Sequence, residues 1–309
     1  MATTTSITTT YAGEFAGKYV SAALLSGSTL ANDIITVKPN VKFKEVMKKV
    51  SSDDIVKDAT CDFDSTSTLT LSERILQPEE FQVNLQLCKK DFVSDWEAIS
   101  MGYSAFSDLP SSFSDFLIGH VAGKVAQKIE TNIWQGVNAT AGQFDGFEVT
   151  LGADGDVVDV AAVGGGVTAA NVVAQMGATI DAIPSSVYGA EDLTVYVSPN
   201  VYRAYVRALG GFATNIGGAG TDDKGTQWFN GGGLTFDGIT VALAQGMSAN
   251  KMVAAEKSNL FFGTGLISDQ NEVKVIDMAD IDGSQNVRVV MRFTAGIQHA
   301  IGSDVVLYS

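Results

Sequence analysis

The chain has 309 residues, which is room for one large domain or two interleaved ones. Hydrophobic residues make up 45% of it and aromatic residues 9%, a composition that buries a core and excludes a disordered polymer. The net charge is -15, and no Lys or Arg lies between Lys128 and Arg203, which argues against binding of nucleic acid through its phosphates. The 32 glycines and only 5 prolines favour β-structure with long loops.

The N-terminal segment predicts an arm rather than part of a core. Its opening, MATTTSITTT, has neither the basic nor the apolar region of a secretion signal, and no segment is apolar enough to cross a bilayer, so we expect neither export nor membrane residence. A short amphipathic helix follows, with an apolar residue at every fourth position: Tyr11, Phe15, Tyr19 and Ala23. One narrow stripe cannot hold such a helix by itself, so the arm needs something to lie on.

The next region has the alternation of a β-ribbon. Val41 and Phe43 alternate with Lys42 and Lys44, and apolar residues recur at every second position on both sides of a turn at 77–80. We therefore predict an extended β-hairpin that cannot lie free in water, because isolated two-stranded ribbons are marginally stable. The alternating residues are Leu69 and Leu71 before the turn, and Phe81, Val83, Leu85 and Leu87 after it.

A short helical piece at 92–101 precedes the strongest helix signal, which runs from Ser112 to Gln135. Its stripe at every fourth residue predicts a long rod packed obliquely on a sheet. Beyond it the pattern alternates between helix and strand. The predicted elements are a helix capped by Thr168, with Val172, Met176 and Ile180 inward; a strand at Leu193–Val197; and a helix opened by Ser198-Pro199 and closed by Gly210-Gly211.

The last third combines a Gly-rich stretch with long strands. Residues 210–233 hold nine glycines, a loop too long for a compact domain unless it has a function. Strands are predicted at 239–243, 273–276 and 287–301, with Asp282-Gly283 turning one strand into the next. In the last strand, one face carries Val289, Met291, Phe293, Ala295 and Ile297.

No reactive constellation accompanies these elements. We interpret both histidines as structural and not catalytic: His120 lies within the long helix, and His299 continues the inward face of the last strand. No serine-nucleophile or phosphate-binding motif is complete. Cys61 and Cys88 are too few for a Cys/His metal site, although their spacing leaves a disulfide open. Two carboxylate clusters lack calcium-loop spacing and fit surface turns: Asp154, Asp156 and Asp159, and Asp277, Asp280 and Asp282. We expect no catalytic residue, no metal and no cofactor, so the chain is interpreted as a structural or assembly protein.

The order of these elements resembles that of tailed-bacteriophage major capsid proteins, the Hong Kong 97 phage capsid fold, over essentially the whole chain. Three short sequence segments are typical of that family: Leu71-Ser72-Glu73-Arg74 followed by Phe81-Gln82-Val83-Asn84, Tyr196-Val197-Ser198-Pro199, and Arg292-Phe293-Thr294-Ala295-Gly296. The resemblance implies an α+β fold and a protein that assembles with itself. Its divisions would be an N-terminal arm at 1–40, an extended hairpin loop at 41–91, a peripheral domain at 92–164 with a spine helix at 110–136, an axial domain at 165–265 with a Gly-rich axial loop at 212–232, and returning strands at 266–309.

The resemblance also implies a function and interface residues. The chain would form the pentamers and hexamers of an icosahedral virion shell, assembled in the host cytoplasm, that encloses double-stranded DNA without reading its sequence. Separate scaffolding, portal or decoration proteins would be its other partners. An encapsulin-like compartment is the nearest alternative, and a secreted acidic glycan hydrolase or adhesin is a remote one. The expected interface residues are Lys42, Lys44, Lys48, Lys49, Phe81, Val83, Leu85 and Leu87 on the hairpin, and Trp228 and Phe229 at the symmetry axes.

Overall fold

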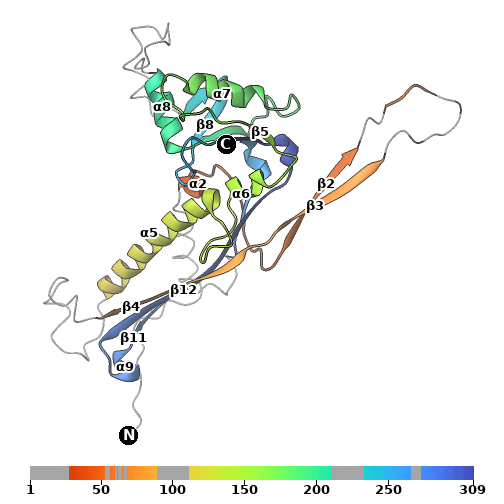
Figure 1. The fold of residues 1–309 in the computed structure, drawn as a ribbon. Helices are drawn as coiled ribbons and strands as arrows, with labels where there is room; N and C mark the ends of the chain where they lie inside the picture. Colours follow the sequence, from red (N-terminus) through yellow and green to blue (C-terminus); the bar gives the residue numbers. More distant parts are fainter. Residues whose placement is uncertain are drawn as a thin grey trace.

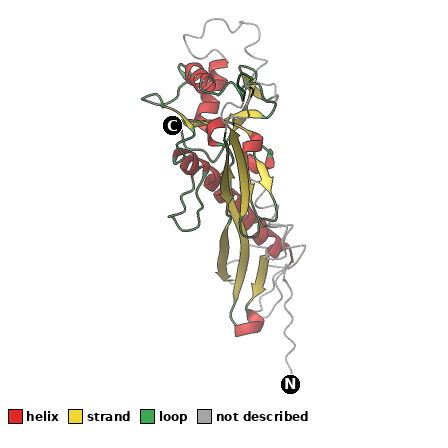
Figure 2. Ribbon diagram, turned by 90° about the vertical axis from the view of Figure 1, so that its right-hand side faces the viewer, coloured by secondary structure: helices red, strands yellow, loops and turns green. Residues whose placement is uncertain are grey.

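The computed structural model describes residues 28–52, 56–59, 61, 65, 68–88, 111–209, 233–265 and 273–309. Three predicted segments lie outside these residues: the helix that contains Tyr11, the helical piece at 92–101 and the Gly-rich loop at 212–232. The described part is an elongated α+β structure. The six-stranded sheet and its helices lie at one end, and a long hairpin projects from the side (Figure 1; Figure 2).

A five-stranded sheet forms the elongated half of the molecule. The long strand β12 is its centre: the N-terminal part of β12 pairs with β4 and β11, and its last residues pair with β10. All five residues predicted to share one face of β12 are buried, as expected. The strands of this sheet are β1 (Thr36–Lys38), β4 (Glu79–Cys88), β10 (Leu260–Gly263), β11 (Val273–Asp277) and β12 (Asn286–His299).

Helix α5 (Ser111–Gln135) covers the buried face of this sheet, and Figure 1 shows it running beside β12. Five members of the predicted stripe are buried: Leu117, Val121, Val125, Ile129 and Ile133. The chain then turns back sharply, because Gly146 donates its backbone N–H to the carbonyl of Gly136 at 2.8 Å. A Cβ on Gly146 would meet backbone carbonyls of α5 at 2.6 Å, so only glycine fits this close approach.

A six-stranded mixed sheet forms the other end, in the order β5-β13-β9-β6-β8-β7. Helices α7 and α8 pack on one face of it and close a core of their own, with Met176 and Tyr205 among its members. Its opposite face, which includes Tyr196 and Val253, belongs to the same core as α5 and β12, so one hydrophobic core joins the two sheets. The elements here are β5 (Val158–Val160), α7 (Val172–Asp181), β6 (Leu193–Val197), α8 (Pro199–Leu209), β7 (Leu234–Phe236), β8 (Ile239–Leu243), β9 (Met252–Glu256) and β13 (Val306–Tyr308).

Short elements complete the described chain. Gly283 adopts a left-handed φ of 72° at the end of α9, and so turns the chain from β11 toward β12 as predicted. The short elements are α2 (Ser28–Ala31), α6 (Phe147–Gly152), α9 (Ala279–Asp282) and the 3₁₀ turns η1 (Lys257–Asn259) and η2 (Gly302–Asp304).

The predicted strand pairing of the hairpin was wrong. Strand β3 (Leu69–Leu76) pairs with β2 (Glu45–Ser52), and β4 leaves the hairpin to pair with β12. Only two residues separate β3 from β4, and a two-residue hairpin turn needs a positive φ at its first position, here Gln77. Gln77 is not among the positive-φ residues of the described chain, so the strand bends at Pro78 and continues instead of reversing.

Two further details differ from the sequence-based prediction. Val41 does not begin the ribbon: it is buried, and its backbone N–H bonds to the carbonyl of Thr264. Helix α7 begins at Val172 with Asn171 as its N-cap, so Thr168 does not cap it. The side chain of Asn171 instead accepts the backbone N–H of Thr168 at 2.7 Å, which forms a turn before the helix. The inward residues Val172, Met176 and Ile180 are buried as predicted.

Candidate functional site

The β2–β3 hairpin has one exposed apolar face. In an antiparallel pair, directly opposed residues lie on the same face, and the register places Val46 opposite Ile75 and Val50 opposite Leu71. Between these pairs Lys48 lies opposite Glu73. We call this surface the hairpin apolar face; its apolar members, all exposed, are Val46, Val50, Leu69, Leu71 and Ile75.

The other face of the hairpin contacts the rest of the same chain, and we call the part formed by the two larger sheets and their helices the body. Leu76, at the root of the hairpin, is fully buried against Gly263 of β10. Two residues further out, Arg74 bonds to Asp154 in the turn after α6, and Lys49 lies 3.4 Å from the hydroxyl of Ser303. Because these contacts occupy one face, the hairpin apolar face points away from the body. Figure 1 shows that β2 and β3 project from the rest of the molecule.

Three side chains meet at the hairpin root, and we call them the root cluster: Arg74, Asp154 and His299. One oxygen of Asp154, Oδ2, accepts a hydrogen bond from the Arg74 guanidinium and lies 2.8 Å from Nε2 of His299. The other oxygen, Oδ1, accepts the backbone N–H of Asp156 at 3.1 Å. His299 is fully buried, and its Nδ1 has no partner among the described residues.

The root cluster shifts the pKa values of its members. Burial lowers the pKa of His299 below its usual value, and the hydrogen bond to Asp154 only partly opposes this. Burial alone would raise the pKa of Asp154, but the bonds from His299, the Asp156 N–H and Arg74 together outweigh it and lower that pKa. The cluster therefore combines an ionised carboxylate with a neutral imidazole, which donates from Nε2.

The predicted apolar row on β4 lies in the five-stranded sheet and not on the projecting hairpin. Phe81, Val83 and Leu87 are partly buried against the core shared with α5, and Phe81 stacks on Phe293 with ring centroids 5.6 Å apart. Leu85 alone among the four is exposed. The assignment of this row to the hairpin was therefore wrong, because it depended on the mistaken pairing of β3 with β4.

The four lysines that we expected at a subunit interface lie on or beside the hairpin. Lys42 and Lys44 are exposed just before β2, and the Lys44 ammonium lies 5.5 Å from the ring centroid of Phe43. Lys48 is exposed within the hairpin apolar face, whereas Lys49 faces the body. Trp228 and Phe229 lie outside the described residues. The sequence-based prediction missed the pairing of Val46 with Ile75 and of Val50 with Leu71, although the alternation of these residues is visible in the sequence.

A buried carboxylate joins the arm to the body. Glu130 of α5 accepts bonds from the backbone N–H and the hydroxyl of Thr29, at 2.9 and 2.6 Å, and from the hydroxyl of Ser28 at 3.0 Å. The backbone N–H of Gly246, after β8, lies 3.3 Å from the same carboxylate. Trp134, one turn along α5, donates its indole N–H to Thr29 at 2.9 Å. The last residues before the body are thus fixed to α5.

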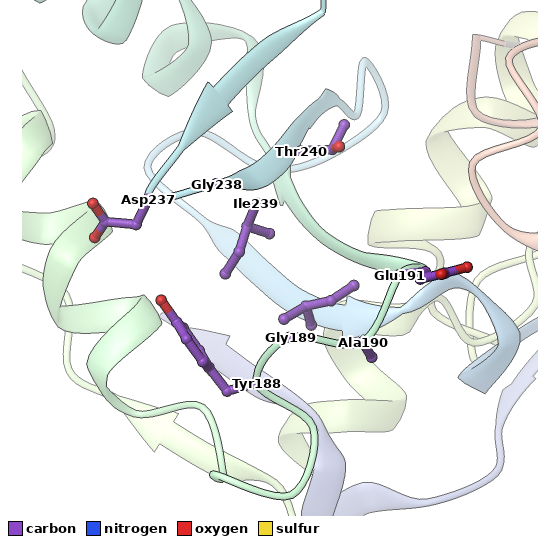
Figure 3. A pocket seen from close by; sticks show the side chains of 9 residues that line it. Tyr188, Gly189, Ala190, Glu191, Asp237, Gly238, Ile239 and Thr240 are labelled. Carbon is purple, nitrogen blue, oxygen red and sulfur yellow. The ribbon is translucent and has the colours of Figure 1, made fainter.

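Two surface pockets lie among the residues that the structure describes, and neither gathers a set of reactive groups. One open pocket of about 280 Å³ lies where β6 and β8 begin, and Figure 3 shows its carboxylates, Asp237 and Glu191, at opposite ends. A second, of about 410 Å³, lies beside α5 and includes Glu130, whose oxygens are already bonded. Neither pocket has a His, Cys or Lys in its lining. Within the described ranges no His/Cys/Asp/Glu group could hold a metal ion, and Cys61 and Cys88 are free thiols.

The described helices also include none that is long and apolar enough to span a bilayer. His120 is exposed on α5, and His299 is buried on the inner side of β12 as predicted. Asp154, which the sequence assigned to a simple surface turn, is instead bonded within the root cluster. No sequence signal pointed to that cluster, because its members lie 80 and 145 positions apart along the chain.

Comparison of the whole fold with solved structures gives a consistent result. The capsid of a native GTA particle aligns with a TM-score of 0.62 at 14% identity, covering 93% of this chain and 89% of that chain. The capsid of Myoviridae phage XM1 aligns with a TM-score of 0.56 at 13% identity, covering 91% of both chains. Mycobacterium phage Che8 aligns with a TM-score of 0.52 at 11% identity, covering 100% of this chain and 94% of that chain. This chain has the phage capsid fold.

The sequence identity to these structures is low, between 11% and 14%. No family model matches the sequence, and neither does any curated protein. The alignments cover nine tenths or more of this chain, so the likeness extends over both sheets and is not confined to one of them. The capsid fold expected from the order of elements is thereby confirmed, while its division into named subdomains stays a prediction.

Proposed function

We propose that this chain is the major capsid protein of a tailed phage, which assembles into pentamers and hexamers of an icosahedral shell around double-stranded DNA. The observation that carries the proposal is the alignment of the whole chain with phage capsid subunits. A projecting hairpin with an exposed apolar face supports a structural, non-enzymatic role in assembly. Its place would be the virion.

The hairpin apolar face is the proposed contact with a neighbouring subunit. Each of its side chains is between 41% and 73% exposed, an unfavourable arrangement in water for a two-stranded ribbon. Covering such a side chain contributes on the order of 1 to 2 kcal/mol, whereas an exposed charge pair contributes about 0 to 1 kcal/mol. The apolar residues should therefore dominate, and Lys48 with Glu73 should set orientation more than strength.

Other features of the proposal rest on the sequence. The Gly-rich loop at 212–232 would lie at the five-fold and six-fold axes, with Trp228 and Phe229 as apolar contacts. Lys42 and Lys44 would face carboxylates of a neighbour. A separate scaffolding or decoration protein is a further proposed partner; one similar structure, the satellite phage P4 procapsid, is described as including a size determination protein.

The proposal is tested by assembly of the purified chain. Expressed with and without its neighbouring genes, the protein should form rings or closed shells that are visible by electron microscopy. A monodisperse monomer at every protein and salt concentration, and with co-expressed neighbours, would refute it. Shells filled with an enzyme, from a locus without terminase or portal genes, would favour the encapsulin-like alternative.

A further inference from the structure

Several contacts hold the root of the hairpin: Gln298 donates its side-chain amide to the carbonyl of Ile75 at 3.1 Å, and Lys38 pairs with Glu45 at 2.6 Å. One further contact, from Arg74, ends on a carboxylate that His299 shares. Leu76 is buried at the root, Arg74 bonds to Asp154, and Lys49 reaches Ser303 at 3.4 Å. The Asp154 carboxylate is in turn held by His299 at 2.8 Å and by the Asp156 N–H at 3.1 Å. Gly302 permits this packing, since a Cβ there would overlap the Asp154 carboxylate.

We propose that the root cluster Arg74, Asp154 and His299 is a latch that fixes the direction in which the hairpin leaves the body. Arg74 lies on the face opposite the hairpin apolar face, so its bond to Asp154 turns the apolar residues outward. With Arg74 released, the buried Leu76 and the 3.4 Å contact of Lys49 with Ser303 remain on this face, and the hairpin gains freedom to swing about its root. The three side chains are positioning residues for assembly.

This inference goes beyond the proposed function, because a latch within one subunit can be measured without assembly. It also predicts a dependence on pH. The imidazole has one bonded nitrogen, Nε2, and a proton added at Nδ1 would find no acceptor among the described residues. The added Nδ1–H would be a buried donor without an acceptor, beside the Arg74 cation, and these costs oppose the gain from pairing with Asp154. Protonation should therefore displace the ring and free Asp154.

The charged groups around His299 come from every neighbouring segment. Arg74 belongs to β3, and Asp154, with Asp156 bonded to it, belongs to the turn after α6. Of these, Asp154 alone bonds directly to the imidazole, so the response to pH should depend on this pair. The pKa of His299, lowered by burial, places the release below neutral pH.

Pulsed electron-spin distances on isolated subunits test the latch. One nitroxide is placed on β3 by Ser72→Cys and the other on the body by Tyr188→Cys, both at exposed sites, after Cys61→Ser and Cys88→Ser remove the native thiols. At pH 7.5 we expect one narrow distance distribution. Arg74→Ala should broaden it at least twofold, whereas Glu73→Ala, the next residue on the opposite face, should leave it unchanged.

Repeating these distance measurements at lower pH distinguishes a latch from a merely structural contact. The unmodified cluster should broaden the distribution as the pH is lowered in steps from 7.5 to 4.5, a range in which Asp154 stays ionised because its pKa is lowered. His299→Gln keeps an N–H donor for Asp154 and does not titrate, so its distribution should stay narrow throughout. An unchanged distribution in Arg74→Ala would overturn the latch, and an unchanged distribution in the wild-type cluster over the whole range would overturn its control by His299. Circular dichroism confirms that each variant is folded, and neither result depends on whether shells form.

Discussion

Glu130 is the residue on which three parts of the chain converge. It is 6% exposed, and its two oxygens accept bonds from Ser28, Thr29 and Gly246, which belong to the end of the arm and to the connection after β8. A buried carboxylate is stable only when its oxygens are bonded, and here backbone N–H groups and hydroxyls supply those bonds. Glu130 therefore stabilises the fold by accepting bonds from polar groups that would otherwise be left without this acceptor.

Replacing this carboxylate should destabilise the subunit measurably. Glu130→Ala leaves two backbone N–H groups and two hydroxyls without their acceptor, so we expect the free energy of unfolding to fall by about 3 kcal/mol. The matched control, Gln127→Ala, lies one turn earlier on the exposed side of α5 and should change it by less than about 0.5 kcal/mol. Urea unfolding followed by circular dichroism measures both. Equal effects of the two variants would contradict this role.

The root cluster should make the stability of the subunit depend on pH. Because the pKa of His299 is lowered in the folded state, the unfolded chain binds more protons just below pH 6.5, and stability falls as the pH drops through this range. The pKa of Asp154 is also lowered, so its contribution is complete above its usual value of 3.8 and is lost only at lower pH.

Between pH 7.5 and 5.5 the histidine should therefore account for the effect. We expect the free energy of unfolding to fall by at most about 1.4 kcal/mol for each pH unit below 6.5, and His299→Gln to abolish that part of the slope. Urea midpoints at several pH values measure it. A wild-type stability that rises on acidification over this range would contradict the assigned neutral state of the imidazole.

At the scale of elements, the hairpin apolar face leads to a matched pair of variants. Leu71→Asp puts a charge in the centre of the exposed face, and Ser72→Asp puts the same charge one residue away on the other face. Since Leu71 is 70% exposed, neither variant should disturb the isolated subunit. We expect Leu71→Asp to abolish assembly, with an unchanged circular dichroism spectrum, while Ser72→Asp still assembles.

Assembly is read by sedimentation and electron microscopy, and folding by circular dichroism. If Leu71→Asp assembles normally, the face is not a subunit contact. If it unfolds the subunit, the hairpin belongs to the subunit's own core. Leu85, which the sequence predicts on the hairpin, is instead exposed on β4 of the five-stranded sheet. Replacing it with Asp therefore tests whether that sheet, and not the hairpin, contacts a neighbouring subunit.

The elements that could be predicted from sequence are those with a long, regular pattern. The stripe from Leu117 to Ile133 identified α5, and the alternation from Val289 to Ile297 identified β12, because these elements bury one continuous face. The pairing of β2 with β3 was missed because residues 53–68 separate them, and pairing across a short connection is the ordinary expectation. The absence of glycine at Gln77 was the signal against a turn there.

The root cluster could not be predicted at all. Arg74, Asp154 and His299 come from a strand, a turn and the end of another strand, and they meet only because β12 passes the hairpin root beside the turn after α6. Single polar residues carry no periodicity, so only the tertiary arrangement shows that they form a set. The same holds for Glu130, which the sequence places beside Ile129 without any sign that it is buried.

At the scale of the whole molecule, one core joins two sheets whose separate patterns suggested interleaved domains. Tyr196 of the six-stranded sheet packs on Trp134 of α5 with ring centroids 5.5 Å apart, and its hydroxyl bonds to the carbonyl of Ile34 at 2.6 Å. Burial raises the pKa of this tyrosine, so it stays neutral in the shared core. The body is therefore a single unit, and variation between copies in a shell should fall on the segments that leave it.

The Gly-rich loop at 212–232 is the segment on which we expect that variation to be greatest. A closed icosahedral shell built from one sequence must surround some axes with five copies and others with six. The nine glycines at 210–233 allow several backbone paths at little steric cost, which a loop of β-branched residues could not follow. Trp228 and Phe229 would supply apolar contact at the axis with little loss of side-chain entropy.

Cryo-electron microscopy of one assembled particle tests this expectation. Superposed on their shared core, the symmetry-distinct subunits should differ most in this loop, in the arm or in the hairpin, and least in α5 and β12. Replacing Gly217, Gly218 and Gly220 together with Val should favour a single ring size and yield few closed shells, whereas Thr221→Val, which places a valine in the same loop without loss of glycine, should assemble normally. Identical loop paths in every environment, lying away from the axes, would show that the glycines serve another purpose.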